Sequence, residues 1–278
     1  MSVGVFLAVL GAALLHASWN AIIKTGLNKQ TSMFLMSIGQ TICALPIVLL
    51  FPFPEPRIWV WIIGSGVIHA AYQMFLAYAY EQGDLSRVYP ISRGSAPMML
   101  LVVSLLFLNE PLAPMSLLGV LVLGLGIALM ARGVFASGES RRLLPFAFGA
   151  AIATMSYTLV DGLGARAWGE PVAYVAWLMI VSGPLFALII GSLRGFSILR
   201  ARPKDWGVGM IAGGASIASY AVAVWAMTLA PIALVAALRE TSILFAVLIG
   251  WLVFGDKMDR TKIAAALLIV TGVALTRL

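Results

Sequence analysis

The stretch that decides the fold spans residues 232–254 and reads IALVAALRETSILFAVLIGWLVF. A helix of about 20 apolar residues crosses the hydrocarbon core of a bilayer, and this stretch is long enough to do so. Its two charged side chains, Arg239 and Glu240, lie inside the apolar run rather than at its ends. The stretch therefore predicts a membrane-spanning helix that carries an arginine and a glutamate within the bilayer.

The composition extends this prediction to the whole chain. Of its 278 residues, 62% are hydrophobic and 10% are charged, and the mean hydropathy is +1.01. A soluble protein carries about 25% charged residues, so the solvent of this chain must be lipid. Long apolar runs without a two-residue alternation favour helices over a β-barrel. The sequence predicts an all-α integral membrane protein, and its single cysteine, Cys43, excludes a disulfide framework.

Apolar runs between turn signals predict ten transmembrane helices. The predicted spans are residues 3–23, 32–51, 58–80, 87–108, 113–131, 144–165, 171–192, 206–229, 232–254 and 261–277. The connections are too short for a soluble catalytic domain, so the function must lie between the helices. The basic residues are scattered singly among apolar spans, which is typical of membrane orientation and not of nucleic-acid binding. No cleavable signal peptide is evident before the first span.

The two halves of the chain resemble each other. Glu110 and Asp256 each follow a fourth helix, and the same offset of 146 residues places Arg93 on Arg239. We expect a first five-helix repeat in residues 1–131, a linker in 132–143 and a second repeat in 144–278. Because each repeat has an odd number of helices, the two repeats must be inverted in the membrane. Inverted repeats are typical of secondary transporters, which bind substrate between the repeats near the bilayer midplane.

The acidic turns Asn109-Glu110 and Gly255-Asp256, each followed by a glycine-containing fifth helix, resemble the EamA-type branch of the drug/metabolite transporter (DMT) superfamily. The resemblance covers the whole chain and implies a ten-helix transporter. Members carry amino acids, nucleotide sugars, organic cations and other metabolites, so the resemblance does not name the substrate. Residues 16–20 and 89–94 are also similar to a subgroup associated with phosphonate utilisation.

Two arginines, Arg93 and Arg239, fall within predicted spans at equivalent positions of the repeats. A guanidinium at bilayer depth costs at least about 2.5–3.5 kcal/mol, so each must face a partner or a wet cavity. One hypothesis is that they bind a carboxylate, phosphate or phosphonate, which suits the planar guanidinium. The alternative is a structural ion pair of one arginine with Glu240 or Asp161.

These two carboxylates are also candidates for proton coupling. Glu240 could bind a substrate amine or a coupling proton, or could simply neutralise an arginine. Asp161 lies near the end of the sixth predicted span, where a solvated carboxylate or a pair with Arg166 is the expected alternative to a role at the interface.

Further polar residues within the spans are candidates for substrate contacts. They are His16 and Asn20 on the first helix, His69, Tyr72 and Gln73 on the third, Tyr157 on the sixth and Tyr220 on the eighth. For each of these residues, interhelical hydrogen bonding or packing is the alternative role. Pro90, Gly94 and Pro97 predict an interrupted fourth helix beside Arg93, and Gly213-Gly214 predicts a loosened eighth helix.

Together these features predict a secondary transporter that moves a small zwitterionic or anionic metabolite by alternating access. Its expected partners are a small-molecule substrate, the lipid of the cell (inner) membrane and a coupling proton, with the chain acting as a monomer or homodimer. An organic-cation efflux pump is the alternative, and a membrane enzyme a more distant one. No zinc pattern, catalytic set or phosphate loop is evident, so we expect no cofactor and no metal.

The orientation of the chain is left open by two conflicting indications. Loops on one side carry thirteen basic residues and loops on the other side carry three. The positive-inside rule then places both termini outside the cell. The family resemblance instead implies that both termini lie in the cytoplasm.

Overall fold

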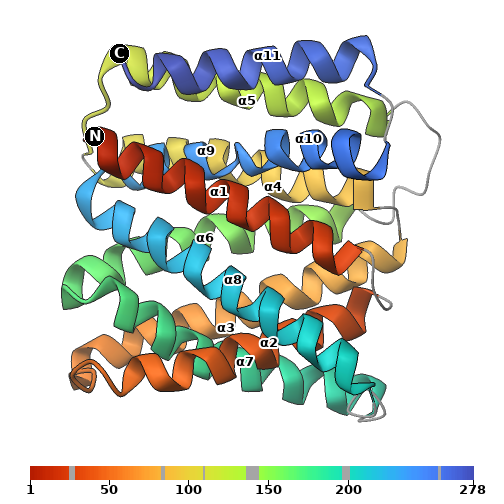
Figure 1. Cartoon of the computed structure of the whole chain (residues 1–278). Coiled ribbons are helices and arrows are strands. Elements are labelled where there is room, and N and C mark those ends of the chain that lie inside the picture. The colour runs from red at the N-terminus through yellow and green to blue at the C-terminus, as the bar shows by residue number, and fades with distance from the viewer. Residues whose placement is uncertain (25–28, 83–84, 109, 136–143, 196–200, 256–257) are drawn as a thin grey trace.

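The computed structural model describes residues 1–24, 29–82, 85–108, 110–135, 144–195, 201–255 and 258–278. These residues fold into helices without a β-strand (Figure 1), as the sequence predicts for an all-α protein. Part of the predicted linker, residues 136–143, lies outside the described residues, as do Asn109 and Asp256 of the two acidic turns.

The helices follow the predicted spans, with one exception described below. The first half contains α1 (Val3–Lys24), α2 (Lys29–Val48), α3 (Pro56–Gln82), α4 (Leu85–Val103), a π-helical turn (Ser104–Leu108) and α5 (Pro114–Phe135). The second half contains α6 (Leu144–Trp168), α7 (Pro171–Arg194), α8 (Pro203–Leu229), α9 (Ile232–Arg239), α10 (Ser242–Phe254) and α11 (Arg260–Leu275). Both termini lie at the same end of the molecule (Figure 1).

Local sequence explains where several helices begin and end. Pro171 and Pro203 start α7 and α8, where a missing N–H costs no hydrogen bond. The side chain of Asp259 accepts a hydrogen bond from the backbone N–H of Lys262 and so caps the start of α11. Gly255 adopts a left-handed φ of 70° and ends α10.

Seven stretches of the described chain are long and apolar enough to cross a membrane. They are Val3–Ile22, Thr31–Val48, Pro56–Ala79, Leu144–Trp168, Pro171–Leu193, Pro203–Leu229 and Ile232–Phe254. Large apolar side chains such as Val60, Phe107 and Leu252 are exposed on the outer surface, where lipid rather than water can cover them. Both features are those of a multi-pass membrane protein.

The packing of the helices repeats itself between the two halves. Three contacts between the halves each have a counterpart with the halves exchanged. The α2–α8 contact corresponds to the α7–α3 contact, the α3–α6 contact to the α8–α1 contact, and the α4–α6 contact to the α10–α1 contact. The pairs α2–α7 and α5–α11 join equivalent helices of the two halves. Exchanging the halves therefore maps the packing onto itself, as in two inverted repeats.

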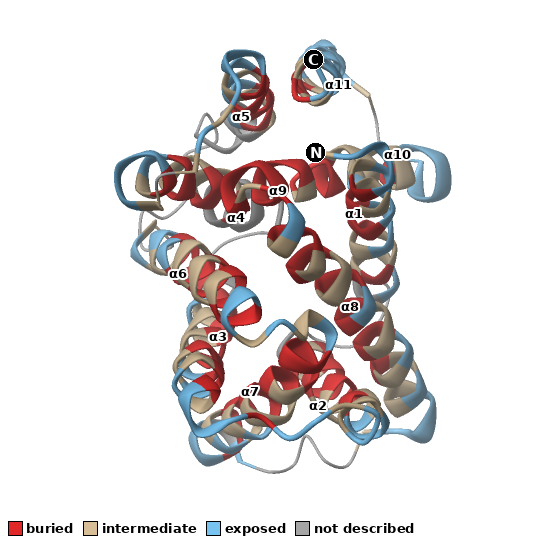
Figure 2. Ribbon diagram, turned by 90° about the vertical axis from the view of Figure 1, so that its left-hand side faces the viewer, coloured by how far each residue is buried: buried red, intermediate tan, exposed pale blue. Residues whose placement is uncertain are grey.

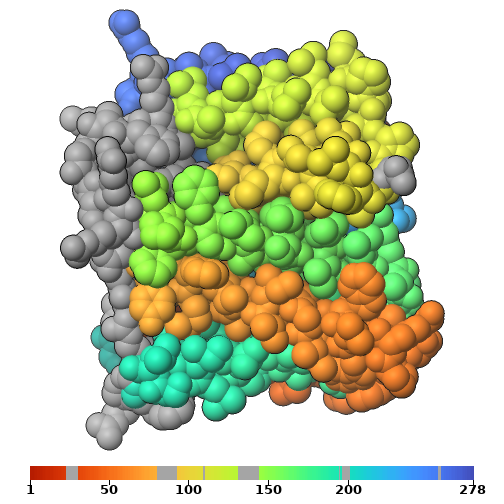
Figure 3. All heavy atoms as spheres, turned by 180° about the vertical axis from the view of Figure 1, so that it is seen from behind, coloured from red at the N-terminus to blue at the C-terminus, as the bar shows by residue number. Residues whose placement is uncertain are grey.

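This packing turns the buried faces of several helices toward the middle of the molecule. Along one face, α5, α4, α6, α3 and α7 lie side by side in that order (Figure 3). An end-on view shows the buried faces of α1, α4, α6, α8 and α9 turned inward, while α5 and α11 stand apart on one side (Figure 2). Residues on the inward faces are therefore the candidates for a site.

The predicted helix interruptions are wrong in position. The backbone of α4 is helical through Pro90, Gly94 and Pro97. The break occurs instead in the predicted ninth helix, between α9 and α10. There the N–H groups of Glu240 and Thr241 bond to carbonyls three residues back, which closes α9 with a tight turn before α10 begins.

Gly213 does not loosen α8 either, because it lies where α8 crosses α2. A Cβ atom at Gly213 would lie 2.5 Å from the backbone N of Gln40 and 2.6 Å from the carbonyl carbon of Gly39. The neighbouring Gly214 has only the Cys43 sulfur nearby, at 3.5 Å. Gly213 thus permits close backbone contact between the repeats, which is a common use of small residues in membrane proteins.

We expect Gly213→Ala to destabilise the protein by about 1–3 kcal/mol, because two backbones must separate to admit the methyl group. The matched variant Gly214→Ala should be neutral or slightly stabilising, since alanine is a better helix former than glycine. Thermal unfolding of the two purified variants in detergent measures the difference. Equal melting temperatures would show that the α2–α8 contact yields without cost.

Candidate functional site

A narrow pocket lies between the repeats and brings three charged residues together. Helix α4 of the first repeat contributes Arg93, and the end of α9 in the second repeat contributes Arg239 and Glu240. The other lining residues are Ala96, Pro97, Leu100, Thr154, Met155, Tyr157, Thr158 and Ala236. Its cavity volume is about 10 Å³, which is room for about one water molecule. The pocket therefore has no room for a metabolite in this structure.

Arg93 and Glu240 form a buried ion pair across the repeat boundary. Arg93 Nη2 lies 3.0 Å from Glu240 Oε1, and Arg93 Nε donates to Oε2 at 3.3 Å. Their side chains are 4% and 5% exposed, so solvent does not screen the pair. Arg93 and Glu240 thus adopt the ion pair that the sequence left open as an alternative to solute binding.

Arg239 lies in a different environment, although it is equivalent to Arg93 in the repeat. Its guanidinium stacks on the ring of Tyr220 at 4.9 Å from the centroid. Within the described chain it contacts no carboxylate, and its side chain is only partly buried. The pocket therefore contains one positive charge that no carboxylate of the described residues neutralises.

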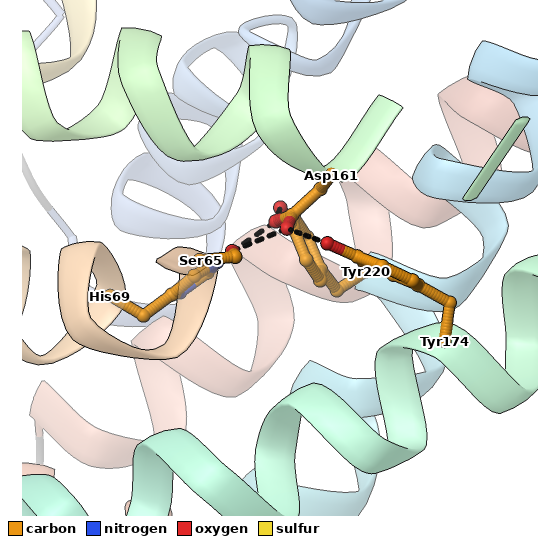
Figure 4. A network of polar contacts seen from close by, with 5 residues as sticks. All are labelled: Ser65, His69, Asp161, Tyr174 and Tyr220. Carbon is orange, nitrogen blue, oxygen red and sulfur yellow. Dashed lines mark hydrogen bonds and ion pairs between the residues drawn. The ribbon is translucent and has the colours of Figure 1, made fainter. Parts of the chain in front are cut away.

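Asp161 is the centre of a buried polar cluster drawn from four helices (Figure 4). Its side chain is inaccessible to solvent. One oxygen, Oδ1, accepts hydrogen bonds from Ser65 and from Tyr174 at 3.1 Å. The other, Oδ2, accepts from Tyr220 and lies 3.0 Å from Nε2 of His69. The expectation that Asp161 is solvated or paired with Arg166 is wrong, because α6 turns this residue toward α3, α7 and α8.

Arg166 instead ties the second repeat to the first at one end of the bundle. Its guanidinium donates to the carbonyls of Met227 and Ala230 at 2.8 and 2.9 Å, and to Glu110 at 2.5 Å. Glu110 also accepts from the backbone N–H of Ile232 and so satisfies the first turn of α9. Arg166 directly follows the sixth predicted span, and the sequence did not indicate its contact with Glu110.

Aromatic rings connect the Asp161 cluster to the pocket. The ring of His69 stacks on Tyr157 at 4.0 Å between centroids, and Tyr157 lines the pocket. Tyr72 and Tyr220 each approach Tyr157 edge-on. The structure thus brings together four of the residues that the sequence nominated separately.

The remaining predicted residues lie nearby in different settings. Gln73 is buried, and its side-chain oxygen has no hydrogen-bond partner among the described residues. His16 is close enough to Arg93 and Arg239 to experience their positive charge. Asn20 donates to the carbonyl of His16 on its own helix at 2.8 Å, which is a local role.

Three polar residues of the site escaped the sequence analysis. Ser65 precedes His69 by four residues and shares its helix face, so this spacing could have revealed it. Tyr174 lies in the first turns of α7, and nothing in its apolar surroundings distinguishes it. Thr154 lines the pocket with a buried hydroxyl that has no hydrogen-bond partner in the described part of the chain, and it precedes Thr158 by one helical turn.

Comparison with known proteins identifies the architecture around this pocket. The sequence model of the EamA-like transporter family matches residues 2–132 and again residues 142–278, which is nearly the whole chain. The chain belongs to the EamA-like transporter family. EamA-like proteins are membrane transporters of the DMT superfamily, so the resemblance inferred from the acidic turns is confirmed.

The fold of this EamA-like protein also occurs among solved structures. One crystal structure, described only as that of a protein, superposes with a TM-score of 0.81. The match covers 99% of this chain and 98% of the other, at 18% sequence identity, and therefore establishes the fold alone. No curated protein matches the sequence.

Proposed function

We propose that this EamA-like transporter moves a small polar metabolite with an anionic group, either an amino-acid-like zwitterion or a phosphonate-like anion. The observation that carries the proposal is Arg239, a guanidinium in the inter-repeat pocket without a carboxylate partner among the described residues. A planar guanidinium binds a carboxylate or phosphonate through two parallel hydrogen bonds, so it favours such a group over a neutral one.

The charge of the pocket supports an anionic rather than a cationic solute. Glu240 is held by Arg93, and Asp161 is enclosed by hydroxyl groups and His69. An organic-cation efflux pump would need a carboxylate facing the pocket without a cation beside it. Among the described residues, the uncompensated charge is instead that of Arg239.

Other groups of the pocket suit the rest of an amino-acid-like solute. Tyr157 lines the pocket, and an aromatic ring attracts an ammonium group. The unpartnered hydroxyl of Thr154 offers a hydrogen bond. These groups favour a zwitterion over a simple anion.

We infer that the mechanism is alternating access between the two repeats. The pocket has room for only about one water molecule, and it is lined by residues of both repeats. A solute at this position can leave only when one repeat moves relative to the other, as in other inverted-repeat transporters. We place the protein in the cell (inner) membrane, where a multi-pass carrier of metabolites would act.

Thermal unfolding of the detergent-purified protein against amino acids, aminophosphonates, phosphorylated metabolites and organic cations tests this function. A ligand at about 100 times its Kd stabilises the folded state by about 2.7 kcal/mol. We expect stabilisation by zwitterions or anions, and its loss in Arg239→Ala. Stabilisation by lipophilic cations alone would contradict the proposed solute class.

A further inference from the structure

We propose that Asp161 and His69 form a proton-binding site that couples solute movement in this chain to a proton gradient. The inference rests on the proposed function, because a coupling ion requires a transported solute. It starts from an unusual juxtaposition: a carboxylate and an imidazole lie 3.0 Å apart in the interior of a membrane protein, and both are buried.

The imidazole is the partner of Asp161 that changes charge most readily. Ser65, Tyr174 and Tyr220 contribute hydroxyl groups, which are neutral near pH 7. Histidine gains or loses a proton between about pH 5 and 8. The proton therefore belongs to the pair, which alternates between a carboxylate with neutral imidazole and a carboxylate with imidazolium. Proton uptake removes the net negative charge from the buried site.

The contact between His69 and Asp161 joins the two repeats, so a movement of one repeat relative to the other would change their separation. His69 is on α3 of the first repeat, whereas Asp161 is on α6 of the second. Relative motion of the repeats lengthens the contact between them and admits water. The proton is then bound in the closed form and released when the contact opens.

Two aromatic side chains link this site to the solute pocket. Tyr220 donates its hydroxyl hydrogen to Asp161 while its ring lies under the guanidinium of Arg239, and His69 stacks on Tyr157. An anion bound to Arg239 cancels a positive charge next to the pair and so favours proton uptake. Since such coupling is reciprocal, a bound proton also favours the anion, and the two move together in the same direction.

Other ionisable groups around the site do not offer an equivalent pair. Tyr174 of α7 and Tyr72 of α3 are phenols that stay neutral near pH 7. Arg93 of α4 and Glu240, at the end of α9, neutralise each other. In the part of the chain that the structure describes, the remaining charged group that contacts the cluster is Arg239 of α9, which the solute itself neutralises.

The test uses proteoliposomes and three radiolabelled probes, 2-aminoethylphosphonate, L-alanine and L-glutamate. Counterflow at equal pH measures solute exchange and needs no net proton movement. Accumulation under an inside-alkaline gradient measures coupling. With one coupled proton, a gradient of one pH unit supports about tenfold accumulation. We expect the wild-type protein to exchange at least one probe, and to accumulate that probe until an uncoupler is added.

Two conservative variants separate proton binding from structure. Asp161→Asn keeps the shape of the side chain, and His69→Gln places an amide N–H where Nε2 lies, but neither variant forms a pair that binds a proton. We expect both to retain counterflow and to lose gradient-driven accumulation. The matched control is Asp205→Asn, because Asp205 pairs with Arg202 at the exposed start of α8, and it should retain both activities.

The possible outcomes are distinguishable. Accumulation retained in both variants would overturn the proton site. So would loss of counterflow in both variants while they still elute as folded protein, because that result assigns the pair to solute binding. If the wild-type protein exchanges a probe in counterflow but does not accumulate it under the pH gradient, the coupling is overturned and the proposed function stands. Failure of all three probes to exchange would overturn the proposed function and this inference with it.

Discussion

Transport by the Arg239→Ala variant should fall by about 10- to 100-fold, because the solute loses its charge-assisted hydrogen bonds. Such bonds contribute about 1.5–3 kcal/mol, and 1.4 kcal/mol corresponds to a factor of ten. The variant should insert and fold normally, since among the described residues Arg239 forms no ion pair whose loss would leave a buried charge. Counterflow in proteoliposomes measures the effect.

Two further variants show whether geometry or charge alone is needed at this position. Arg239→Lys keeps the charge but cannot form two parallel hydrogen bonds, so we expect intermediate transport. Arg57→Ala serves as the arginine control, because Arg57 is exposed and pairs with Glu55 near the start of α3. Full activity of Arg239→Ala would remove the basis for an anionic solute.

The largest loss of stability should follow from Arg93→Ala. This change leaves the carboxylate of Glu240 buried without its partner, which costs about 3–5 kcal/mol for a buried ion pair. The exposed control Arg57→Ala should cost less than about 1 kcal/mol. Thermal unfolding in detergent compares the two variants.

A double variant distinguishes the loss of the whole Arg93–Glu240 ion pair from the loss of Arg93 alone. Arg93→Met with Glu240→Met removes both charges and fills the site with apolar atoms, so we expect most of the stability to return. If Arg93→Ala unfolds at the wild-type temperature, Arg93 does not stabilise Glu240, and both arginines would again be candidates for the solute.

The sequence was sufficient for the fold because lipid imposes a simple rule. Each spanning helix needs about 20 apolar residues, and the predicted spans correspond to helices, except that residues 232–254 are divided between α9 and α10. The break between α9 and α10 was missed because Arg239, Glu240 and Thr241 are compatible with a continuous helix. The interruption depends on backbone hydrogen bonds three residues apart, which composition does not indicate.

The prediction of an interrupted α4 failed for the opposite reason. Pro90, Gly94 and Pro97 each weaken a helix, but neighbouring helices in a membrane protein can support one that contains them. Helix α4 packs against both α5 and α6, and its backbone remains helical. The sequence shows the residues that weaken α4 locally, but it does not show the neighbouring helices that stabilise it.

For the site, the sequence identified residues but not partners. It singled out Arg93, Arg239, Glu240 and Asp161 because charge within the bilayer is costly. Which carboxylate meets which arginine depends on the relative rotation of α4, α6 and α9. The cluster around Asp161 likewise requires Ser65, Tyr174 and Tyr220 from three other helices, and their proximity exists only in the folded chain.

The most direct test of the central claim is counterflow with matched solutes that differ only in the anionic group. The pairs are L-alanine against L-alaninamide, and 2-aminoethylphosphonate against ethanolamine. If Arg239 binds the anion, at least one acid should exchange, and its partner without the anionic group should exchange far more slowly. Faster exchange of L-alaninamide and ethanolamine than of the acids would contradict the account and favour a carrier of cations.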